Sequence, residues 1–253
     1  MSNENFVYTA LIGQYETLNE LTFQKNDSTH YVCFTDDEKL RSDTWEIRLI
    51  IPPVLNDSIR SSRYLKMLGH RYFPQNSKCL YIDNSVELKV DGSEILNAAL
   101  VGRCIALMPH SSRKTVRNEF FIVSAYGLAR QDTLWSQFRK YKLSYPSVLK
   151  EAPYWGGMIA KINCQETDNF MSLWYEEYNK YTRRDQLSLN LASYLSEVEI
   201  ATIPGKNYLS EWHVWPVIKF RNTQARDTTS GKKFRKVRII MNALYFGSKY
   251  YLK

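Results

Sequence analysis

Short apolar runs alternate with helix-like segments along most of this chain, and that alternation restricts the fold more than any other feature. Apolar runs that stop at polar, turn-prone residues occupy 6–12, 31–36, 79–82 and 104–108. Helical spacing of apolar residues, or a capping residue, marks 58–72, 93–100 and 115–129. Strands that alternate with helices predict an α/β fold with a mostly parallel central sheet.

The pattern continues after residue 129. A helix is expected over 136–143, and a strand over 154–160 that bends at Gly156 and Gly157, where a ligand or another strand can approach the backbone closely. Asp168 is expected to cap an aromatic-rich helix over 169–177, and Asp185 to cap a helix that runs to about residue 194.

Composition predicts a globular, intracellular protein. With 253 residues and a hydrophobic share of 44%, the chain can build one sizeable core. The four cysteines stand apart in the sequence without zinc-type spacing, so they are interpreted as reduced core thiols. No long apolar stretch or basic leader is apparent, which predicts a cytoplasmic protein.

Positive charge is concentrated at the C-terminal end. Residues 231–253 contain seven lysines and arginines and no acid, whereas the whole chain carries a net charge of +8. Residues 1–221 are therefore expected to form the folded domain, and 222–253 a tail with a basic amphipathic helix. Such a helix predicts peripheral binding to an anionic membrane surface, at the inner face of the membrane.

The segment Asp83-Asn84-Ser85 ends one of the apolar runs. A carboxylate at a strand end can hold a divalent cation, Mn²⁺ or Mg²⁺, that neutralises a diphosphate. The second acid of an Asp-x-Asp motif is missing here, which leaves Ser85 as a weak ligand and His213 as a candidate nitrogen ligand. A simple turn after the strand is the alternative interpretation.

A second polar segment contains Arg184, Asp185 and Gln186 at the start of the last helix. A carboxylate pinned at a helix N-cap can act as a base toward an acceptor hydroxyl, or can stabilise positive charge that develops on a sugar. The sequence leaves these two roles open, and a helix cap alone remains the alternative.

Basic residues mark two further segments. Arg60, Arg63 and Lys66 recur at three-residue steps along the helix expected over 58–72, and His110 and Arg113 follow the strand at 104–108. Arginine can bind an oxyanion through two hydrogen bonds, and the dipole at a helix N-terminus also attracts negative charge. Both segments are therefore candidates for binding phosphate or acceptor. A solvated helix face is the alternative.

The ordered set of motifs resembles a glycosyltransferase-like family that was first known as a domain of unknown function, with members among plant turgor-regulation and mucilage proteins and bacterial capsule and O-antigen proteins. The resemblance covers about residues 6–195 and is carried by the following segments: 7–18, 33–36, 45–48, 64–66, 70–74, 81–85, His110 with Arg113 and Glu119, 174–177 and 184–188.

This resemblance implies a GT-A-like single domain. It implies that Tyr8, Thr9 and Gly13 lie at the first strand end, that Asp36 faces the base or ribose, and that Arg63 and Lys66 face the phosphates. Asp83 would then face the metal or ribose, and Asp185 with Gln186 the sugar. The remaining candidates for substrate binding are Arg60, Asn84, His110, Arg113, Trp155, Gly156, Gly157 and Arg184.

The resulting expectation is a hexosyltransferase that uses a nucleotide diphosphate sugar donor and a glycan or lipid-linked acceptor in cell-surface polysaccharide synthesis. The missing second acid keeps open an inactive module that recognises glycans. The positive charge and 18 tyrosines raise nucleic-acid binding as a third possibility. We expect no nucleic-acid partner, because the aromatic residues recur as core residues do and no nucleic-acid-binding signature is present.

Overall fold

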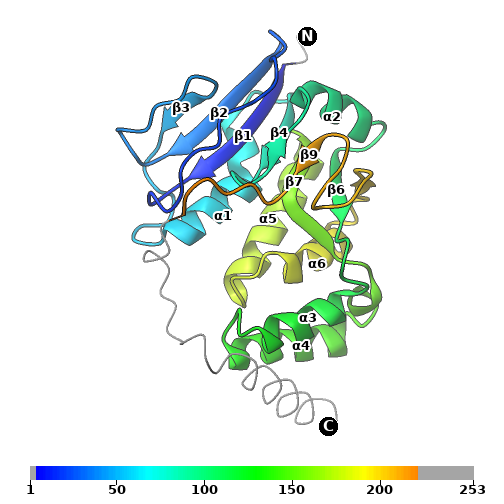
Figure 1. Ribbon diagram of the computed structural model, residues 1–253. Helices are drawn as coiled ribbons and strands as arrows, with labels where there is room; N and C mark the ends of the chain where they lie inside the picture. Colours follow the sequence, from blue (N-terminus) through cyan, green and yellow to red (C-terminus); the bar gives the residue numbers. More distant parts are fainter. Residues whose placement is uncertain (1–3, 222–253) are drawn as a thin grey trace.

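The computed structural model describes residues 4–221, which form a central sheet covered by helices (Figure 1). The sheet has seven strands in the order β3-β2-β1-β4-β7-β6-β8, and a two-stranded ribbon of β5 and β9 lies beside it. The strands are β1 (Asn5–Leu11), β2 (Thr29–Thr35), β3 (Glu46–Leu49), β4 (Lys78–Ile82), β5 (Glu87–Leu88), β6 (Ile105–Pro109), β7 (Tyr154–Ile162), β8 (Ala201–Thr202) and β9 (His213–Val214).

The sheet is mostly parallel, as the alternation of strands and helices predicts. Strands β3, β2, β1 and β4 pair in parallel, and β8 pairs in parallel with β6. Strand β7 runs antiparallel to both of its neighbours, β4 and β6. The register of β7 against β6 shifts at Gly156 and Gly157, because Leu107 faces Ile159 while Met108 faces Trp155. The two glycines therefore lie in an irregular, bulged stretch of the strand.

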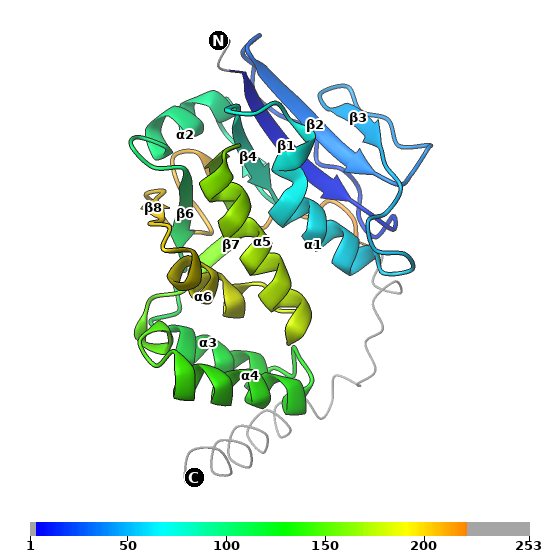
Figure 2. The same ribbon diagram turned by 180° about the vertical axis from the view of Figure 1, so that it is seen from behind.

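Helices cover both faces of the sheet (Figure 2). Helices α1, α5 and α6 lie on one face and α2 on the other, while α3 and α4 form a further layer against α6. The helices are α1 (Ser58–Leu68), α2 (Gly92–Ala99), α3 (Val116–Ala125), α4 (Gln131–Ser144), α5 (Gln165–Lys180) and α6 (Gln186–Ser196), with 3-10 turns at Gly69–Tyr72 and Val148–Lys150.

Strand β1 shows why the sheet needs cover on both sides. Tyr8 and Ala10 point into the cluster under α1 and α5, whereas Val7 and Leu11 point into the cluster under α2. Every residue of β1 is buried. Nearly continuous apolar strands of this kind are typical of a central parallel sheet.

Three expected helix boundaries are wrong, and one of them belongs to the helix expected over 115–129, which ends at Ala125. The helix expected over 58–72 ends at Leu68 and continues as a 3-10 turn. Asp168 does not cap a helix, because α5 begins at Gln165 with Cys164 at its N-cap. The Asp168 carboxylate instead accepts hydrogen bonds from Arg71, with Nη2 and Oδ2 2.9 Å apart. The helix begins earlier than predicted, and Asp168 lies in its first turn, where a carboxylate is also favourable.

Other expected boundaries are confirmed or extended. Asp185 is the N-cap residue of α6, as expected. The helix expected over 136–143 is longer and spans α4. None of the helices in residues 4–221 is both long and apolar enough to cross a bilayer. The basic tail, 222–253, lies outside the described residues.

Candidate active site

The candidate site lies where the strand order reverses. The chain passes from β1 through β2 to β3 on one side of β1, and then places β4 on the other side. In open α/β sheets such a reversal leaves a crevice beyond the carboxyl ends of the two strands, and ligands bind there. Gly13 follows β1 and Asp83 follows β4 at this edge, beside α1 and the N-terminus of α6.

Lys66 and Asp185 meet at the centre of the site. Lys66 comes from α1, and its side chain is only 2% exposed. Its ammonium group donates a hydrogen bond to Oδ2 of Asp185 at 2.6 Å, and Nε of Arg63 lies 3.4 Å from the same oxygen. Oδ1 of Asp185 accepts from the backbone N–H of Gln186 at 3.2 Å. Two helices therefore fix the position of this buried carboxylate.

The charges of this cluster stabilise one another. Burial alone acts to raise the pKa of Asp185, but Lys66, Arg63 and Arg184 outweigh burial and hold that pKa well below its usual range. Burial acts to lower the pKa of Arg63, and Asp185 and Asp83 raise it above its ordinary value. Asp185 is therefore ionised, and Arg63 is cationic, at neutral pH.

Asp83 lies beside the same ammonium group. Its Oδ1 accepts a hydrogen bond from the Tyr81 hydroxyl at 2.8 Å and lies 3.7 Å from Nζ of Lys66. Strand β7 passes close by, since a Cβ built on Gly156 would lie 3.1 Å from Nζ of Lys66. The backbone N–H of Asp83 donates to the carbonyl of Gly157 at 2.8 Å. Gly156 thus lets β7 approach the charged cluster, as the sequence predicts for a close backbone approach, whereas Gly157 leaves room for the ring of Trp155.

A second acidic centre lies at Glu119 in α3. Its Oε2 accepts a hydrogen bond from Nε of Arg113 at 2.8 Å, and its Oε1 lies 3.9 Å from Nη2 of Arg184. Burial raises the pKa of Glu119 despite these two cations, and the charge of Asp185 adds to the increase. Burial, together with Arg113, lowers the pKa of His110 to about 4. His110 is therefore neutral at pH 7.

A third acid, Asp57, caps α1 and lies 3.0 Å from Nη2 of Arg183 and 3.8 Å from Nε of Arg60. Across the three acidic centres, six cationic side chains accompany four carboxylates, which leaves an excess of two positive charges. The cations are Arg60, Arg63, Lys66, Arg113, Arg183 and Arg184, and the carboxylates are Asp57, Asp83, Glu119 and Asp185. The electrostatics of the site therefore favour an anionic ligand.

Three of these arginines have hydrogen-bonding capacity to spare. Within residues 4–221, the buried Nε atoms of Arg60, Arg63 and Arg184 have no hydrogen-bond partner. Buried donors without partners are rare in folded proteins, and each calls for an explanation. Oxyanions are the groups that guanidinium N–H donors bind best.

A small pocket adjoins Arg63 at the end of β1. Gly13 adopts φ of +81°, a left-handed conformation that glycine accommodates readily, and its N–H donates to Oδ1 of Asp36 at 2.9 Å. A Cβ at this position would lie 2.7 Å from Cβ of Ser58. The pocket is lined by Ile12, Gly13, Tyr15, Ser58, Ile59, Ser62 and Arg63. The pocket therefore opens next to the guanidinium group of Arg63.

Some expected site residues lie away from the charged cluster. Tyr8 and Thr9 are fully buried within β1, and the Tyr8 hydroxyl lies 3.4 Å from the carbonyl oxygen of Lys66. Trp155 is buried; its ring stacks on that of His213 with centroids 5.4 Å apart and packs edge-to-face with Trp215 at 5.3 Å. These side chains belong to the buried interior on the two faces of the sheet, and the structure does not bring them to the charged cluster.

The residues around Asp83 do not fit a divalent cation in this arrangement. The Asn84 amide is engaged with the loop at Thr17 and Asn19, and the Ser85 hydroxyl accepts from Nε1 of Trp215 at 3.1 Å. Both ring nitrogens of His213 have partners, the Ser210 hydroxyl at 2.7 Å and the Asn207 carbonyl at 3.1 Å. The predicted ligands Ser85 and His213 are thus committed elsewhere, and a metal requirement stays a prediction from the sequence.

Sequence reasoning missed four contributors: Asp57, Tyr15, Tyr81 and Arg183. Tyr15 lines the small pocket, Tyr81 positions Asp83, and Arg183 pairs with Asp57. Tyr15 and Tyr81 stand next to motifs that the sequence did single out, but a tyrosine in an apolar run is indistinguishable from a core residue. Arg183 precedes Arg184, and only the fold shows that it reaches α1.

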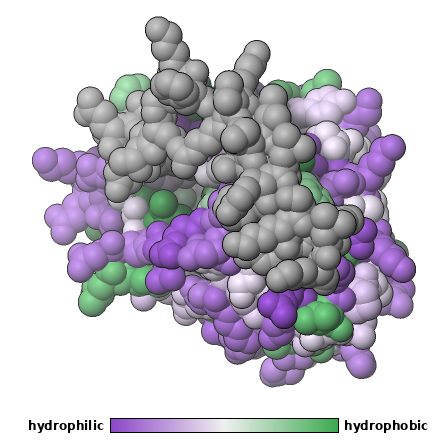
Figure 3. All heavy atoms as spheres, turned by 90° about the horizontal axis from the view of Figure 1, so that it is seen from below, coloured by the Kyte–Doolittle hydropathy of each residue, from purple (hydrophilic) through white to green (hydrophobic). Residues whose placement is uncertain are grey.

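The lower end of the molecule offers a mainly hydrophilic surface. Where described residues are visible from below, hydrophilic side chains dominate and hydrophobic ones appear in small separate areas (Figure 3).

The sequence is similar to a family model and to a known plant protein. A family model described as "TOD1/MUCI70, glycosyltransferase-like domain" matches residues 2–203. The chain is 29% identical over 156 residues to "Probable hexosyltransferase MUCI70" of Arabidopsis thaliana. That alignment covers 58% of this chain and 27% of the relative, so the chain corresponds to about a quarter of that protein's length.

Two solved structures show weaker likeness. The apo structure of the bifunctional glycosyltransferase WbbM is 12% identical in sequence and has a TM-score of 0.46. The alignment covers 81% of this chain and 39% of the WbbM chain. Mouse xyloside xylosyltransferase 1, also in its apo form, is 11% identical in sequence and has a TM-score of 0.40. The alignment covers 77% of this chain and 83% of the mouse chain.

Proposed function

This chain belongs to the TOD1/MUCI70 glycosyltransferase-like family, and we propose that it transfers a hexose from a nucleotide diphosphate sugar to a hydroxyl group of a glycan or lipid-linked acceptor. The observation that carries the proposal is the cationic cluster around Asp185, which lies at the strand-order reversal where α/β proteins bind nucleotides. Family membership supports the reaction class, and the geometry supports the assignment of roles to residues.

The arginines and Lys66 are assigned to the diphosphate. The guanidinium groups of Arg60, Arg63 and Arg184 can bind its oxygens, and the excess positive charge offsets the negative charge of the leaving nucleotide. The small pocket beside Gly13 and Arg63 is assigned to the part of the nucleotide adjacent to the diphosphate. In this arrangement, side chains supply the positive charge that a divalent cation provides in many transferases of this kind.

Asp185 is assigned to electrostatic stabilisation of the sugar. Its cationic neighbours hold its pKa well below the usual range, so it is a weak acceptor of protons near neutral pH. An ionised carboxylate that is fixed at a helix N-cap can stabilise positive charge on an oxocarbenium-like transition state. Of the two roles that the sequence leaves open, the contacts of Asp185 favour this one.

Glu119 is assigned to the proton of the acceptor hydroxyl. Its pKa is raised by burial while that of Asp185 is lowered by its ion pairs, and two carboxylates whose pKa values are pushed apart commonly divide acid–base and electrostatic roles. Arg113 and Arg184 hold the Glu119 carboxylate from two sides, which fixes its orientation.

The experiment that tests the function is a thermal-shift panel of nucleotide diphosphates and their sugars, followed by donor hydrolysis and transfer assays. We expect one nucleotide class to raise the melting temperature of the wild-type protein, and Arg63→Gln to remove that shift. Arg139→Gln is the matched control, because Arg139 is exposed on α4. If no nucleotide sugar bound or reacted, an inactive glycan-recognition module would explain the site better.

A further inference from the structure

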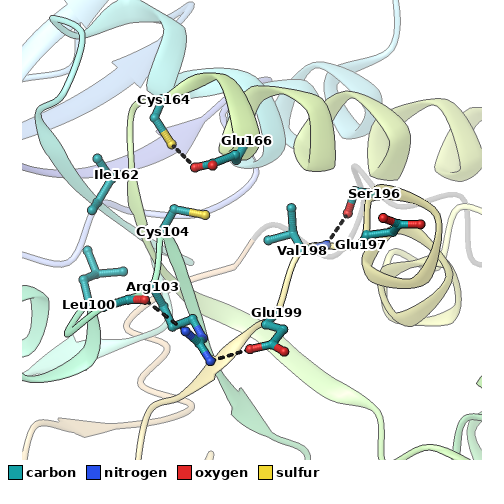
Figure 4. Close-up of a pocket in the computed structure, with 11 residues that line it drawn as sticks. Leu100, Arg103, Cys104, Ile162, Cys164, Glu166, Ser196, Glu197, Val198 and Glu199 are labelled. Carbon is teal, nitrogen blue, oxygen red and sulfur yellow. Dashed lines mark hydrogen bonds and ion pairs between the residues drawn. The ribbon is translucent and has the colours of Figure 1, made fainter.

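A second group of reactive side chains, shown in Figure 4, lies at the amino ends of strands whose carboxyl ends border the candidate active site. Cys104 directly precedes β6, and Cys164 follows β7. Strands β4 and β6 point the same way, because both run antiparallel to β7. Asp83 of the candidate active site follows the carboxyl end of β4. The group therefore lies at the amino ends of β4 and β6. It borders a pocket lined by Leu100, Gly102, Arg103, Cys104, Ile162, Cys164, Glu166, Ser196, Glu197, Val198 and Glu199.

Three potential metal ligands meet in this pocket. One ligand atom each from Cys104, Cys164 and Glu166 lies within 4.8 Å of the other two. Sγ of Cys164 is 3.7 Å from Oε2 of Glu166. Two ligands bound to one tetrahedral zinc ion at about 2.0–2.3 Å lie roughly 3.5–3.8 Å apart, so the observed spacing matches that of a bound pair. Figure 4 shows both thiols and the carboxylate on the same side of the pocket.

The charge of this pocket suits a cation although the chain as a whole is basic. Among its lining side chains, Glu166, Glu197 and Glu199 carry negative charge, and Arg103 is the single cation. Arg103 is already committed to an ion pair with Glu199. The remaining two carboxylates are thus unopposed within the lining, in contrast to the cationic cluster of the candidate active site.

The backbone holds the two cysteines in place. The carbonyl of Cys104 accepts hydrogen bonds from the N–H of Ile162 at 2.8 Å and from Oγ1 of Thr167 at 3.3 Å. The Thr167 hydroxyl also accepts from the Cys164 thiol at 3.5 Å. The end of β7, the start of α5 and the start of β6 are thereby tied together. A ligand set on fixed backbone needs only side-chain rotation to bind an ion.

We propose that Cys104, Cys164 and Glu166 form a binding site for a thiophilic divalent cation, with zinc as the representative ion. Two sulfur ligands select zinc over magnesium or calcium, and the carboxylate completes a three-ligand set. The fourth position faces the pocket and takes water or another ligand. The cysteines have no zinc-type spacing in the sequence, and only the fold brings them together.

The test measures metal binding by the whole reduced protein after chelator treatment. We expect one equivalent of Zn²⁺ to bind and Co²⁺ to produce a sulfur-to-metal charge-transfer band. Cys104→Ser and Cys164→Ser should each weaken zinc binding by at least about tenfold, since changes to the surroundings of metal ligands alone commonly cost 10- to 100-fold. Glu166→Gln should weaken binding while keeping the charge-transfer band.

Matched controls make the result decisive. Glu176→Gln removes an exposed carboxylate from α5, the helix that also carries Glu166, and should leave zinc affinity unchanged. The proposal is overturned if the reduced protein takes up no zinc at micromolar concentrations, or if Cys104→Ser/Cys164→Ser binds as the wild type does. Purification as a Cys104–Cys164 disulfide, with no zinc uptake after reduction, would overturn it as well.

Discussion

The ammonium group of Lys66 donates a hydrogen bond to the carboxylate of Asp185 at 2.6 Å, and this bond joins α1 to the N-terminus of α6 across 119 residues of sequence. Both groups are almost fully removed from solvent, so neither can lose its partner without cost. The same pair lies next to Arg63 and Asp83, and its geometry therefore affects both the stability of the fold and the chemistry of the site.

Replacement of Asp185 and of Glu119 should separate the roles of these two carboxylates. We expect Asp185→Asn to lower kcat by about 10²- to 10³-fold, a typical loss when an electrostatic contact to a transition state is removed. Glu119→Gln should also lower kcat, and should additionally flatten the pH dependence of kcat/KM because the titrating carboxylate is gone. Steady-state kinetics across pH would measure both effects.

The surface pair Arg130 and Asp132 provides the control for these variants. Asp132→Asn removes a solvent-exposed carboxylate that also pairs with an arginine, and kcat should stay at the wild-type value. A flattened pH profile in Asp185→Asn rather than in Glu119→Gln would reverse the assignment of roles.

Loss of the Lys66 ammonium should destabilise the protein. Lys66→Met leaves the buried Asp185 carboxylate with Arg63 as its remaining close ion-pair partner. Breaking a buried ion pair by removing one partner costs about 3–5 kcal/mol, and Arg63 should keep the loss near the lower end of that range. Urea unfolding would measure it, with Lys150→Met, an exposed lysine, as the control. A loss below about 1 kcal/mol would mean that Asp185 is stabilised mainly by its helix.

The sequence predicts the sheet better than it predicts the site. Local patterns are enough to locate β1, β2, β4 and β6, because each is an apolar run that ends at a turn. The antiparallel direction of β7 depends on which strands it joins, and no local pattern encodes that choice. The short strands β3, β5, β8 and β9 contain four residues or fewer, which is too short for periodicity to reveal them.

The site illustrates the same limit at the level of single residues. The sequence identifies Asp83, Lys66 and Asp185 as candidates, but it cannot show that the three charged groups share one cluster. Nor can it show that His213, predicted as a metal ligand, has both ring nitrogens occupied by Ser210 and Asn207. The contacts among Lys66, Asp83 and Asp185 join distant segments of the chain, whereas those of His213 are local in sequence but depend on the conformation of its loop.

Chelation should leave donor binding intact. The positive charge beside Asp83 comes from Lys66 and Arg63, and the predicted ligands Ser85 and His213 already have partners. We therefore expect the melting-temperature shift induced by a nucleotide diphosphate to be the same with Mn²⁺ and with EDTA. The ligand-induced shift is the quantity to compare, because EDTA also strips the proposed zinc site. A shift that appears only with Mn²⁺ would restore the metal to the donor site.

The basic tail should control membrane binding. Residues 231–253 lie outside the described part of the chain, but their seven positive charges and absence of acids predict adsorption to anionic lipid. Deletion of 231–253 should abolish co-sedimentation with vesicles that contain phosphatidylserine, while nucleotide-induced thermal shifts persist. Neutral phosphatidylcholine vesicles are the control. Equal vesicle binding with and without the tail would rule out this role.

Lys161 should make stability depend on pH. Its side chain is fully buried, and its ammonium group donates to the carbonyls of Lys66 at 3.2 Å and Met67 at 3.1 Å. Burial lowers the pKa of Lys161 to about 7, although Cys79 opposes the decrease. Between pH 7 and about 10.4, the unfolded chain binds a proton at this lysine that the folded chain does not, so this group makes stability rise with pH over that window. The melting temperature of the wild type relative to Lys161→Met should therefore increase from pH 7 to 9.5. A difference that stays constant or decreases would show that Lys161 remains charged in the fold.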